Sequence, residues 1–168
     1  MPDKTPKEYF LPSLLDRLTD DDPTTAKEAN DRRLFSQRQL RDSVLRDLTW
    51  LLNTTNFEAV DDLQRYPRVT RSVVNFGIPN LTGWTASSIS ADTIANGVQK
   101  AIQEFEPRIL SRTLKVRAVI SADQMNRNAL GFEIQGLLWG TPAPSSILVR
   151  TEVDLETGHV QIQEFSSF

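Results

Sequence analysis

The chain has 168 residues, of which 39% are hydrophobic and 24% are charged, a composition typical of a folded globular protein. Nineteen basic residues against twenty-two acidic ones give a net charge of -3, which provides no general attraction to nucleic acid or anionic lipid. The absence of cysteine excludes disulfides, thiolate catalysis and cysteine-based metal sites. The N-terminal residues lack the apolar core of a signal peptide, and no apolar run approaches the roughly 20 residues of a membrane-spanning helix. We therefore expect a cytoplasmic protein.

Residues 1–35 are predicted to form a peripheral N-terminal arm that carries one short helix. The leucines within Leu11–Leu18 follow helical spacing. The acidic run Thr19–Pro23 then breaks the pattern, and we expect it to form a solvated turn or to cap a following helix. A calcium loop is the alternative, but the alternating oxygen ligands and the central glycine of an EF-hand are missing. We expect residues 36–168 to form a single α+β domain.

The strongest helical pattern begins at Ser36. Ser36 and Gln39 match the S-x-x-Q capping box that starts many helices. Charged residues, including Arg46 and Asp47, lie mostly on the side opposite an apolar stripe, and the polar residues from Asn53 onward end the helix. The stripe consists of Leu40, Val44, Leu48, Leu51 and Leu52.

The stretch from Phe57 to Gly83 is irregular but rich in apolar residues. Pro67 forces the preceding Tyr66 into an extended conformation. The residues Ser72–Phe76 predict a short strand or a single turn. Because so many side chains in this stretch are apolar, we expect it to pack over the core.

A second helix is predicted to begin near Ser90 or Asp92, and Pro107 stops it because proline lacks a backbone donor and clashes with the preceding turn. Its buried stripe is Ile94, Val98, Ile102 and Phe105.

From Ile109 onward the hydrophobic period changes to two, which is typical of strands. A tight turn is expected at Glu156–Gly158, and consecutive strands with short turns predict an antiparallel meander or a hairpin pair. The fold class is therefore α+β, with N-terminal helices packed on a C-terminal antiparallel sheet of about four strands. The predicted strands are Leu114–Ile120, Leu130–Leu138, Ile147–Leu155 and His159–Phe165.

Few residues are suited to catalysis or metal binding. His159 is the only histidine, which leaves no triad and no histidine-based metal site, and neither Gly-rich phosphate loop is present. A glycosidase needs two carboxyl groups about 5 to 9.5 Å apart, one of them with a raised pKa. None of the candidate carboxylates lies in an apolar pocket that the sequence identifies, so we predict no catalytic residue, no cofactor and no metal. The candidates are Glu104, Glu106, Asp123, Glu133 and Glu152.

The tripeptide Glu106-Pro107-Arg108 stands where the second helix gives way to a strand. One interpretation is a helix stop flanked by two surface charges. The other is that the proline holds an exposed carboxylate and guanidinium at defined angles, so that the pair engages a partner's charges with little loss of entropy on binding. Arg108 and Arg112 continue with Lys115 and Arg117 into a basic stretch. Without interleaved aromatic residues, this stretch predicts a solvated strand face or a surface for an acidic partner rather than a nucleic-acid site.

Several separated segments resemble the small baseplate subunit family of type VI secretion systems, TssE, and the related baseplate wedge proteins of contractile-tailed phages. They are the block Pro12–Pro23, the segment Arg46–Asn53 (R-D-L-T-W-L-L-N), Tyr66-Pro67, Ser72–Gly77 and the tripeptide Glu106-Pro107-Arg108. The sequence departs from the family at Thr55, where arginine is common, and at Phe76, where tyrosine is frequent.

The resemblance implies a structural protein rather than an enzyme. It implies a cytoplasmic baseplate docked at the inner membrane complex, in which the family joins TssF, TssG and TssK and seeds the sheath of TssB and TssC. It also assigns partner contacts to Glu106, Pro107 and Arg108, and we add Arg112 to this set. An edge formed by the last two strands is expected to accept a sheath strand by β-augmentation. The alternative, from the "lysozyme-like" label of the phage family, is a hydrolase that degrades peptidoglycan.

Overall fold

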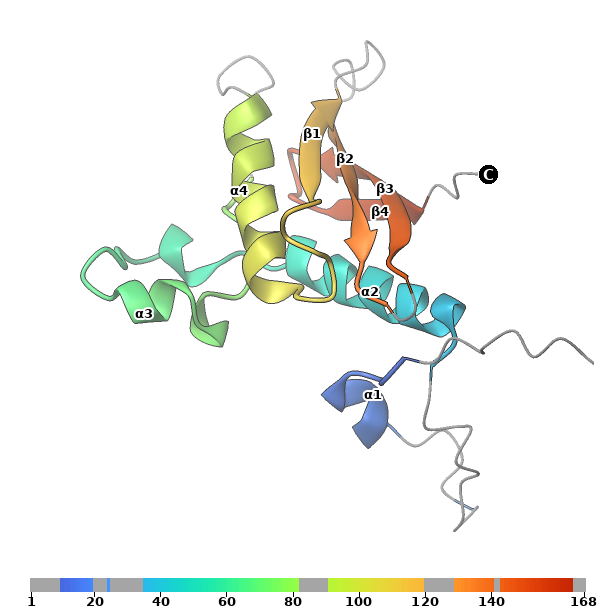
Figure 1. The fold of residues 1–168 in the computed structure, drawn as a ribbon. Helices are drawn as coiled ribbons and strands as arrows, with labels where there is room; N and C mark the ends of the chain where they lie inside the picture. The colour runs from blue at the N-terminus through green and yellow to red at the C-terminus, as the bar shows by residue number, and fades with distance from the viewer. Residues whose placement is uncertain are drawn as a thin grey trace, which may run out of the picture.

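The computed structural model describes residues 10–19, 24, 35–81, 91–119, 129–140 and 143–164. Helices come first along the chain and strands last (Figure 1), which confirms the predicted α+β class and its C-terminal antiparallel sheet of four strands. The helical elements are α1 (Leu14–Leu18), α2 (Gln37–Leu52), the 3-10 turn η2 (Phe57–Ala59), α3 (Pro67–Thr70), the 3-10 turn η3 (Val73–Asn75) and α4 (Ala91–Phe105). The strands are β1 (Lys115–Val119), β2 (Ala129–Leu138), β3 (Ser145–Asp154) and β4 (Val160–Glu164).

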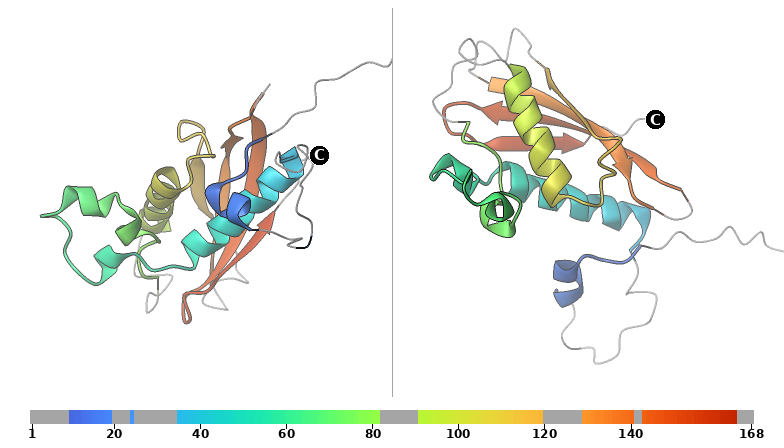
Figure 2. Two further views of the ribbon diagram at one scale, coloured as in Figure 1. Left: turned by 90° about the horizontal axis from the view of Figure 1, so that it is seen from below. Right: turned by 60° about the vertical axis from the view of Figure 1, so that its left-hand side comes forward.

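The strands pair in the order β1-β2-β3-β4, so each strand lies beside its neighbour in sequence. Helix α4 packs against β1, helix α2 packs against β4, and the two helices contact each other, so both cover the same face of the sheet (Figure 2). The covered face contributes residues such as Ile134 and Val149 to the core, where they join Leu48 of α2. The other face is open to solvent and carries the ion pair between Arg150 and Glu133, as expected for an antiparallel sheet with one covered face.

Helix α2 begins where its local chemistry predicts. The Ser36 hydroxyl accepts a hydrogen bond from the Gln39 N–H at 3.3 Å, and Gln39 Oε1 accepts one from the Ser36 N–H at 2.9 Å, so the capping box is confirmed. Every residue of the predicted apolar stripe is buried, and each large aliphatic side chain contributes about 1.5–3 kcal/mol by leaving water. The helix ends at Leu52, and Asn53 is its C-cap, as predicted.

Helix α4 ends at Phe105, two residues before Pro107, as predicted. Val98 and Ile102 of its predicted stripe are buried, whereas Ile94 and Phe105 are partly buried at the edge of the core. The Phe105 ring contacts the Phe76 ring edge-to-face, with 5.4 Å between the ring centroids.

Only the end of the segment between α2 and α4 packs on the core, so the expectation that the stretch from Phe57 onward covers the core is wrong for most of that stretch. Residues 57–76, which we call the protrusion, extend away from the sheet and its covering helices (Figures 1 and 2). Ser72–Phe76 forms the 3-10 turn η3 rather than a strand. The chain returns to the core at the last residue of the protrusion, Phe76, which packs against Phe105, and Ile78 and Leu81 beyond it are buried.

Both edge strands are closed at one residue by an amide side chain from a neighbouring helical segment. At β4, Asn53 Nδ2 donates to the Val160 C=O and Asn53 Oδ1 accepts from the Val160 N–H, both at 2.9 Å. At β1, the Val116 N–H donates to Gln99 Oε1 at 3.2 Å. Because backbone groups alternate in direction along a strand, Ile162 is the next residue of β4 whose N–H and C=O face away from β3. The sequence analysis assigned the edge for strand addition to the last two strands. Because β3 is paired on both sides, only β4 of these two strands has a free edge.

Helix α1 is shorter than predicted, because it begins at Leu14 with Ser13 as its N-cap. The tight turn before β4 is confirmed, since Gly158 has a φ of 74°, which glycine adopts at little cost.

Some predicted features lie outside the described residues, namely the acidic residues 20–22, Gly83 and the predicted strand ends Ile120 and Phe165. Within the described ranges, no helix is both long enough and apolar enough to cross a bilayer.

Candidate functional site

The tripeptide Glu106-Pro107-Arg108 forms a tight corner between α4 and the chain that leads to β1. The Glu106 N–H still donates to the Ile102 C=O at 2.9 Å, so the helical hydrogen bonding continues up to the proline. On the far side, the Arg108 C=O accepts from the Trp139 N–H at 2.7 Å. The corner is therefore fixed between the end of α4 and the end of β2.

Arg108 is hydrogen-bonded on several sides by side chains of its own chain. Its Nε donates to Glu106 Oε1 at 2.7 Å and its Nη2 to Glu106 Oε2 at 2.5 Å, which makes the pair bidentate. From α2, Asp47 Oδ2 accepts from Nη2 at 2.5 Å and the Ser43 hydroxyl accepts from Nη1 at 3.1 Å. The guanidinium thus cross-links the corner to α2.

Glu106 and Arg108 are not the exposed charge pair that the sequence analysis expected. Glu106 is only 3% exposed, and the Arg108 side chain is 21% exposed. The expectation treated two charges beside a helix stop as surface groups, and it is wrong because each finds a partner inside the protein. Burial works to lower the pKa of Arg108, but its hydrogen bonds and charge interactions with Glu106 and Asp47 outweigh burial and raise that pKa above its ordinary value.

The network continues from the corner to α1 through Arg46. Arg46 Nε donates to Asp47 Oδ1 at 2.9 Å, its Nη1 donates to Asp16 Oδ1 at 2.5 Å, and its guanidinium lies 5.2 Å from the centre of the Trp50 ring. Burial works to raise the pKa of Asp16, but the hydrogen bonds from Arg46 and Ser13 and the Arg46 charge outweigh burial, so the pKa lies below its ordinary value. One chain of charges therefore connects α1, α2 and the corner.

An open apolar groove of about 490 Å³ lies beside this network. Its walls come from α1, α2, the base of the protrusion and the corner itself. Pro107 is exposed here, and Trp50 is half exposed. The groove is lined by Leu11, Ser13, Leu15, Asp47, Trp50, Leu51, Phe76, Phe105, Glu106, Pro107 and Arg108.

The structure brings three of the four predicted partner-binding residues together. Glu106 and Arg108 are joined in the network and line the groove with Pro107, whereas Arg112 is exposed, is not among the lining residues and forms no ion pair with any described residue. Asp47 was not among the predicted site residues, because its position on α2 grouped it with the charged side chains opposite the apolar stripe. Ser43 and Asp47 lie one helical turn apart on the same face of α2, which is the only feature of the sequence that groups them. Their shared partner, Arg108, could not be predicted because it lies 61 residues from Asp47 along the chain.

Three of the five carboxylates considered for a hydrolase are held in ion pairs. Glu104 pairs with Arg71 at 3.1 Å, Glu106 with Arg108, and Glu133 with Arg150 at 3.3 Å. Asp123 lies outside the described residues.

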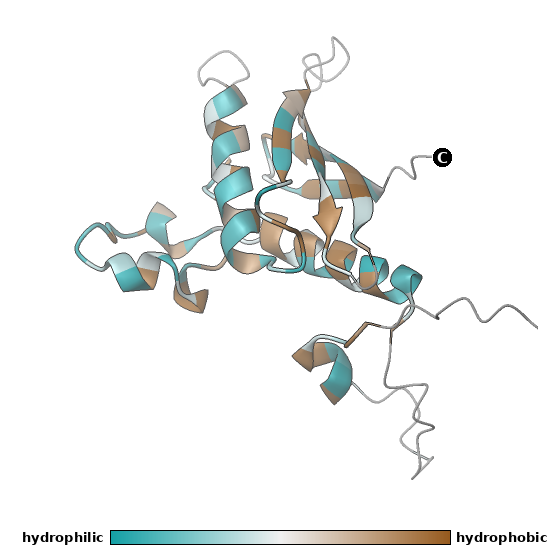
Figure 3. Ribbon diagram, viewed as in Figure 1, coloured by the Kyte–Doolittle hydropathy of each residue, from teal (hydrophilic) through white to brown (hydrophobic). Residues whose placement is uncertain are grey.

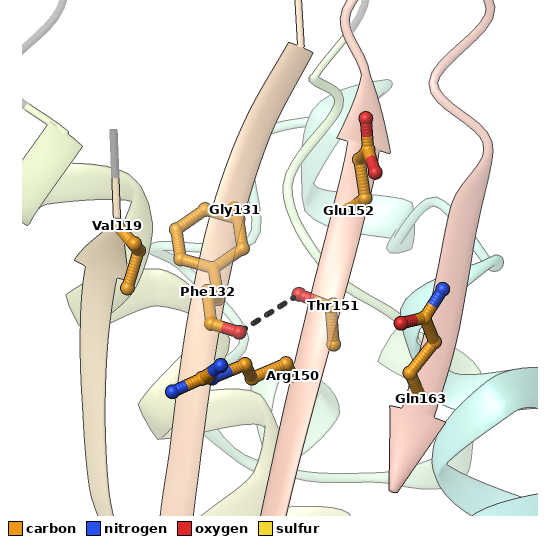
Figure 4. Close-up of a pocket in the computed structure, with 7 residues that line it drawn as sticks. All are labelled: Val119, Gly131, Phe132, Arg150, Thr151, Glu152 and Gln163. Carbon is orange, nitrogen blue, oxygen red and sulfur yellow. Dashed lines mark hydrogen bonds between the residues drawn. The ribbon is translucent and has the colours of Figure 1, made fainter. Parts of the chain in front are cut away.

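A second, shallower pocket of about 140 Å³ lies on the open face of the sheet (Figure 4). Glu152 is the single carboxylate among its lining residues, whereas a glycosidase needs two. Across the ranges that the structure describes, no group of three or more His, Cys, Asp or Glu side chains is placed to hold a metal ion. The pocket is lined by Val119, Gly131, Phe132, Arg150, Thr151, Glu152 and Gln163.

Residues 38–143 match the family model of baseplate wedge protein gp25. This range runs from the first turn of α2 past the end of β2, so it includes the corner, the protrusion and both ends of the Arg108–Asp47 pair. No curated protein and no solved structure matches the chain. Membership of a baseplate wedge family indicates a structural role in a baseplate, in contact with other baseplate components.

Proposed function

This chain belongs to the family of baseplate wedge protein gp25, and from that premise we propose that it is a TssE-type subunit of a type VI secretion baseplate. It joins TssF, TssG and TssK in a wedge and gives the TssB–TssC sheath its starting point. The baseplate is cytoplasmic and docked at the inner membrane complex. Residues 1–35 act as an arm, of which the described part is already held to the domain by the buried Phe10 and by the Asp16–Arg46 ion pair. The observation that carries the proposal is the family match across the Glu106-Pro107-Arg108 corner.

The corner contributes to partner binding by fixing the position of the groove surface, because its own charges are paired within the chain and are not free to bind a partner. The bidentate Arg108–Glu106 pair and the bond to Asp47 fix the exposed Pro107 beside the apolar groove. A surface that is already ordered loses little entropy on binding. A wedge subunit therefore docks apolar side chains in the groove, and the exposed Arg112 contributes a charge to the contact with partners.

The free part of the β4 edge supplies the site for a sheath strand. Asn53 occupies both outward groups of Val160, so an added strand pairs from Ile162 onward. Main-chain hydrogen bonds then provide adhesion, and the closed position at Val160 sets the register.

Co-purification with TssF, TssG and TssK tests the wedge role. Leu11→Ser and Arg112→Glu change exposed side chains and should leave the melting curve of the free protein unchanged while weakening recovery of the complex. Gln161→Glu, on the open sheet face, is the matched control and should co-purify normally. Failure of the wild-type chain to join any wedge subunit would reject the proposal.

Sheath growth tests the edge separately. Ile162→Pro removes an N–H that faces away from β3, so the ladder to β3 is kept and the domain should still fold. We expect wedges that contain Ile162→Pro to assemble but to start few sheaths, as counted by electron microscopy with purified TssB and TssC. Normal sheath numbers from such wedges would exclude strand addition at this edge.

A further inference from the structure

We propose that the protrusion, residues 57–76, is a second docking surface, which binds an acidic segment with apolar side chains on another baseplate subunit. This inference rests on the proposed wedge role, because the partner is a protein of the same assembly. It concerns a surface separate from the groove, since none of the exposed apolar residues of the protrusion lines the groove.

The first observation is the concentration of exposed apolar side chains on this short segment. Val73 and Val74 are 83% and 61% exposed, and Tyr66 is 60% exposed. Phe57 and Val60 are exposed on the same segment, and Figure 3 shows brown, apolar stretches along the protrusion. Single exposed apolar residues need no explanation, but five within 57–76 mark a candidate interaction surface.

The second observation is that the protrusion is internally ordered. Asn75 is buried, its Oδ1 accepts from the Glu58 N–H and its Nδ2 donates to the Thr70 C=O, both at 2.9 Å. These bonds tie the first turn, α3 and the last turn together. Leu63 is also buried. Exposed apolar side chains on an ordered frame bind at a lower entropic cost than those on a disordered loop.

The third observation is the charge around α3. Arg65 and Arg68 are exposed on either side of Tyr66-Pro67, and neither forms an ion pair with a described residue. Arg71 is already paired with Glu104. Two exposed guanidinium groups beside an exposed tyrosine match the composition of protein interfaces, in which arginine and tyrosine are enriched. They select a partner that brings carboxylates to the same place.

The geometry fits a protein better than a membrane or a nucleic acid. Helix α3 has only four residues, too few for an amphipathic helix that lies in a bilayer surface. A nucleic acid makes most of its protein contacts through phosphate and sugar, so it would leave exposed apolar side chains such as Val73 and Val74 without apolar partners.

Site-specific crosslinking on the full-length chain tests the inference. The photoreactive residue p-benzoylphenylalanine replaces Val74 in protein that is co-expressed with TssF, TssG and TssK, and Gln161 on the open sheet face provides the control position. We expect a crosslink from position 74 to a segment of a wedge subunit that is rich in Asp or Glu, and none to that segment from position 161. A crosslink to a second copy of this chain would overturn the inference.

Binding by variants supplies the second arm. Val73→Ser with Val74→Ser, and separately Arg65→Glu with Arg68→Glu, should each weaken binding of the crosslinked subunit on the order of tenfold with unchanged melting curves. Reversing the acidic residues of the crosslinked segment should restore binding to the Arg65→Glu, Arg68→Glu variant. If wild-type protein forms the wedge and both variants bind as tightly, the second docking surface is wrong while the proposed function stands; if wild-type protein forms no wedge, the proposed function itself fails.

Discussion

At the corner, charged side chains are turned inward: Glu106 is buried, and Arg108 is bound to Glu106, Asp47 and Ser43. On the protrusion, apolar side chains such as Val73 and Val74 are turned outward. Both arrangements reverse the usual distribution, but only the first is compensated within the chain. A buried charge must be paired where it lies, whereas an exposed apolar side chain costs the folded protein little. The corner is therefore explained by this protein alone, whereas the exposed apolar side chains of the protrusion are what led us to propose a partner.

The largest effect should come from breaking the corner. Arg108→Glu leaves Glu106 and Asp47 without their cation and adds a third carboxylate, and the loss of one member of a buried pair costs about 4 kcal/mol. We expect the urea midpoint of unfolding to fall accordingly. The matched control is Arg112→Glu, an exposed charge nearby, which should change stability by less than about 0.5 kcal/mol. Equal stability of the two variants would show that the Arg108 network stabilises nothing.

The two regions also differ in how far the sequence predicts them. Ser36 and Gln39 are three residues apart and Pro107 acts on the turn before it, so the bounds of α2 and the end of α4 follow from local chemistry. The Arg108–Asp47 pair depends on how α4 is placed against α2, and a charged residue on a helix carries no mark of its distant partner. For the protrusion, the high content of apolar residues led to a wrong prediction of burial. Apolar composition indicates that side chains tend to be buried, but it does not show whether they are buried by the same chain or by another protein.

The base of the protrusion depends on Gly77. Its φ of 129° is strained for any other residue, and an added Cβ would lie 2.4 Å from the Thr54 carbonyl oxygen. Gly77→Ala should therefore destabilise the protein by about 3 kcal/mol, the upper end of the cost of a strained backbone position. Gly97→Ala is the control, because its Cβ would meet only side-chain atoms of Pro79, at 3.2 and 3.6 Å. Thermal melting compares the two variants. A smaller loss from Gly77→Ala than from Gly97→Ala would contradict this description of the base.

The order of the protrusion should depend on Asn75. Asn75→Ala removes the hydrogen bonds to Glu58 and Thr70, and loss of one buried partner costs about 2 kcal/mol. Because these bonds lie within the protrusion, we expect faster hydrogen exchange in residues 57–76 than in α2. Asn56→Ala, which removes an exposed cap on η2, should have a smaller effect. Uniform exchange changes across the whole protein would show that the protrusion is not a separate unit of order.

The smallest effect concerns the link between α1 and the corner network. The pKa of Asp16 lies below its ordinary value of 3.8, so the folded state favours the ionised form more than the unfolded state does. The contribution of Asp16 to stability is therefore complete above about pH 4 to 5 and is lost as the pH falls through the lowered pKa. Asp16→Asn should cost less than about 1 kcal/mol at neutral pH, and this difference from the wild type should shrink toward zero as the pH is lowered.

Comparing the two proteins at each pH isolates Asp16. The pKa of Asp154 is also lowered, by hydrogen bonds from the Glu156 and Thr157 N–H groups, but that group is present in both proteins and cancels in the difference. Asp42→Asn is the matched control on α2, since the Asp42 side chain is 63% exposed and lies 3.9 Å from Arg38. Because this ion pair is exposed, Asp42→Asn should change stability at neutral pH by less than about 0.5 kcal/mol. If the Asp16→Asn difference stays constant down to the acid transition, the contact of α1 with Arg46 is not an ion pair in solution, and the charge network ends at α2.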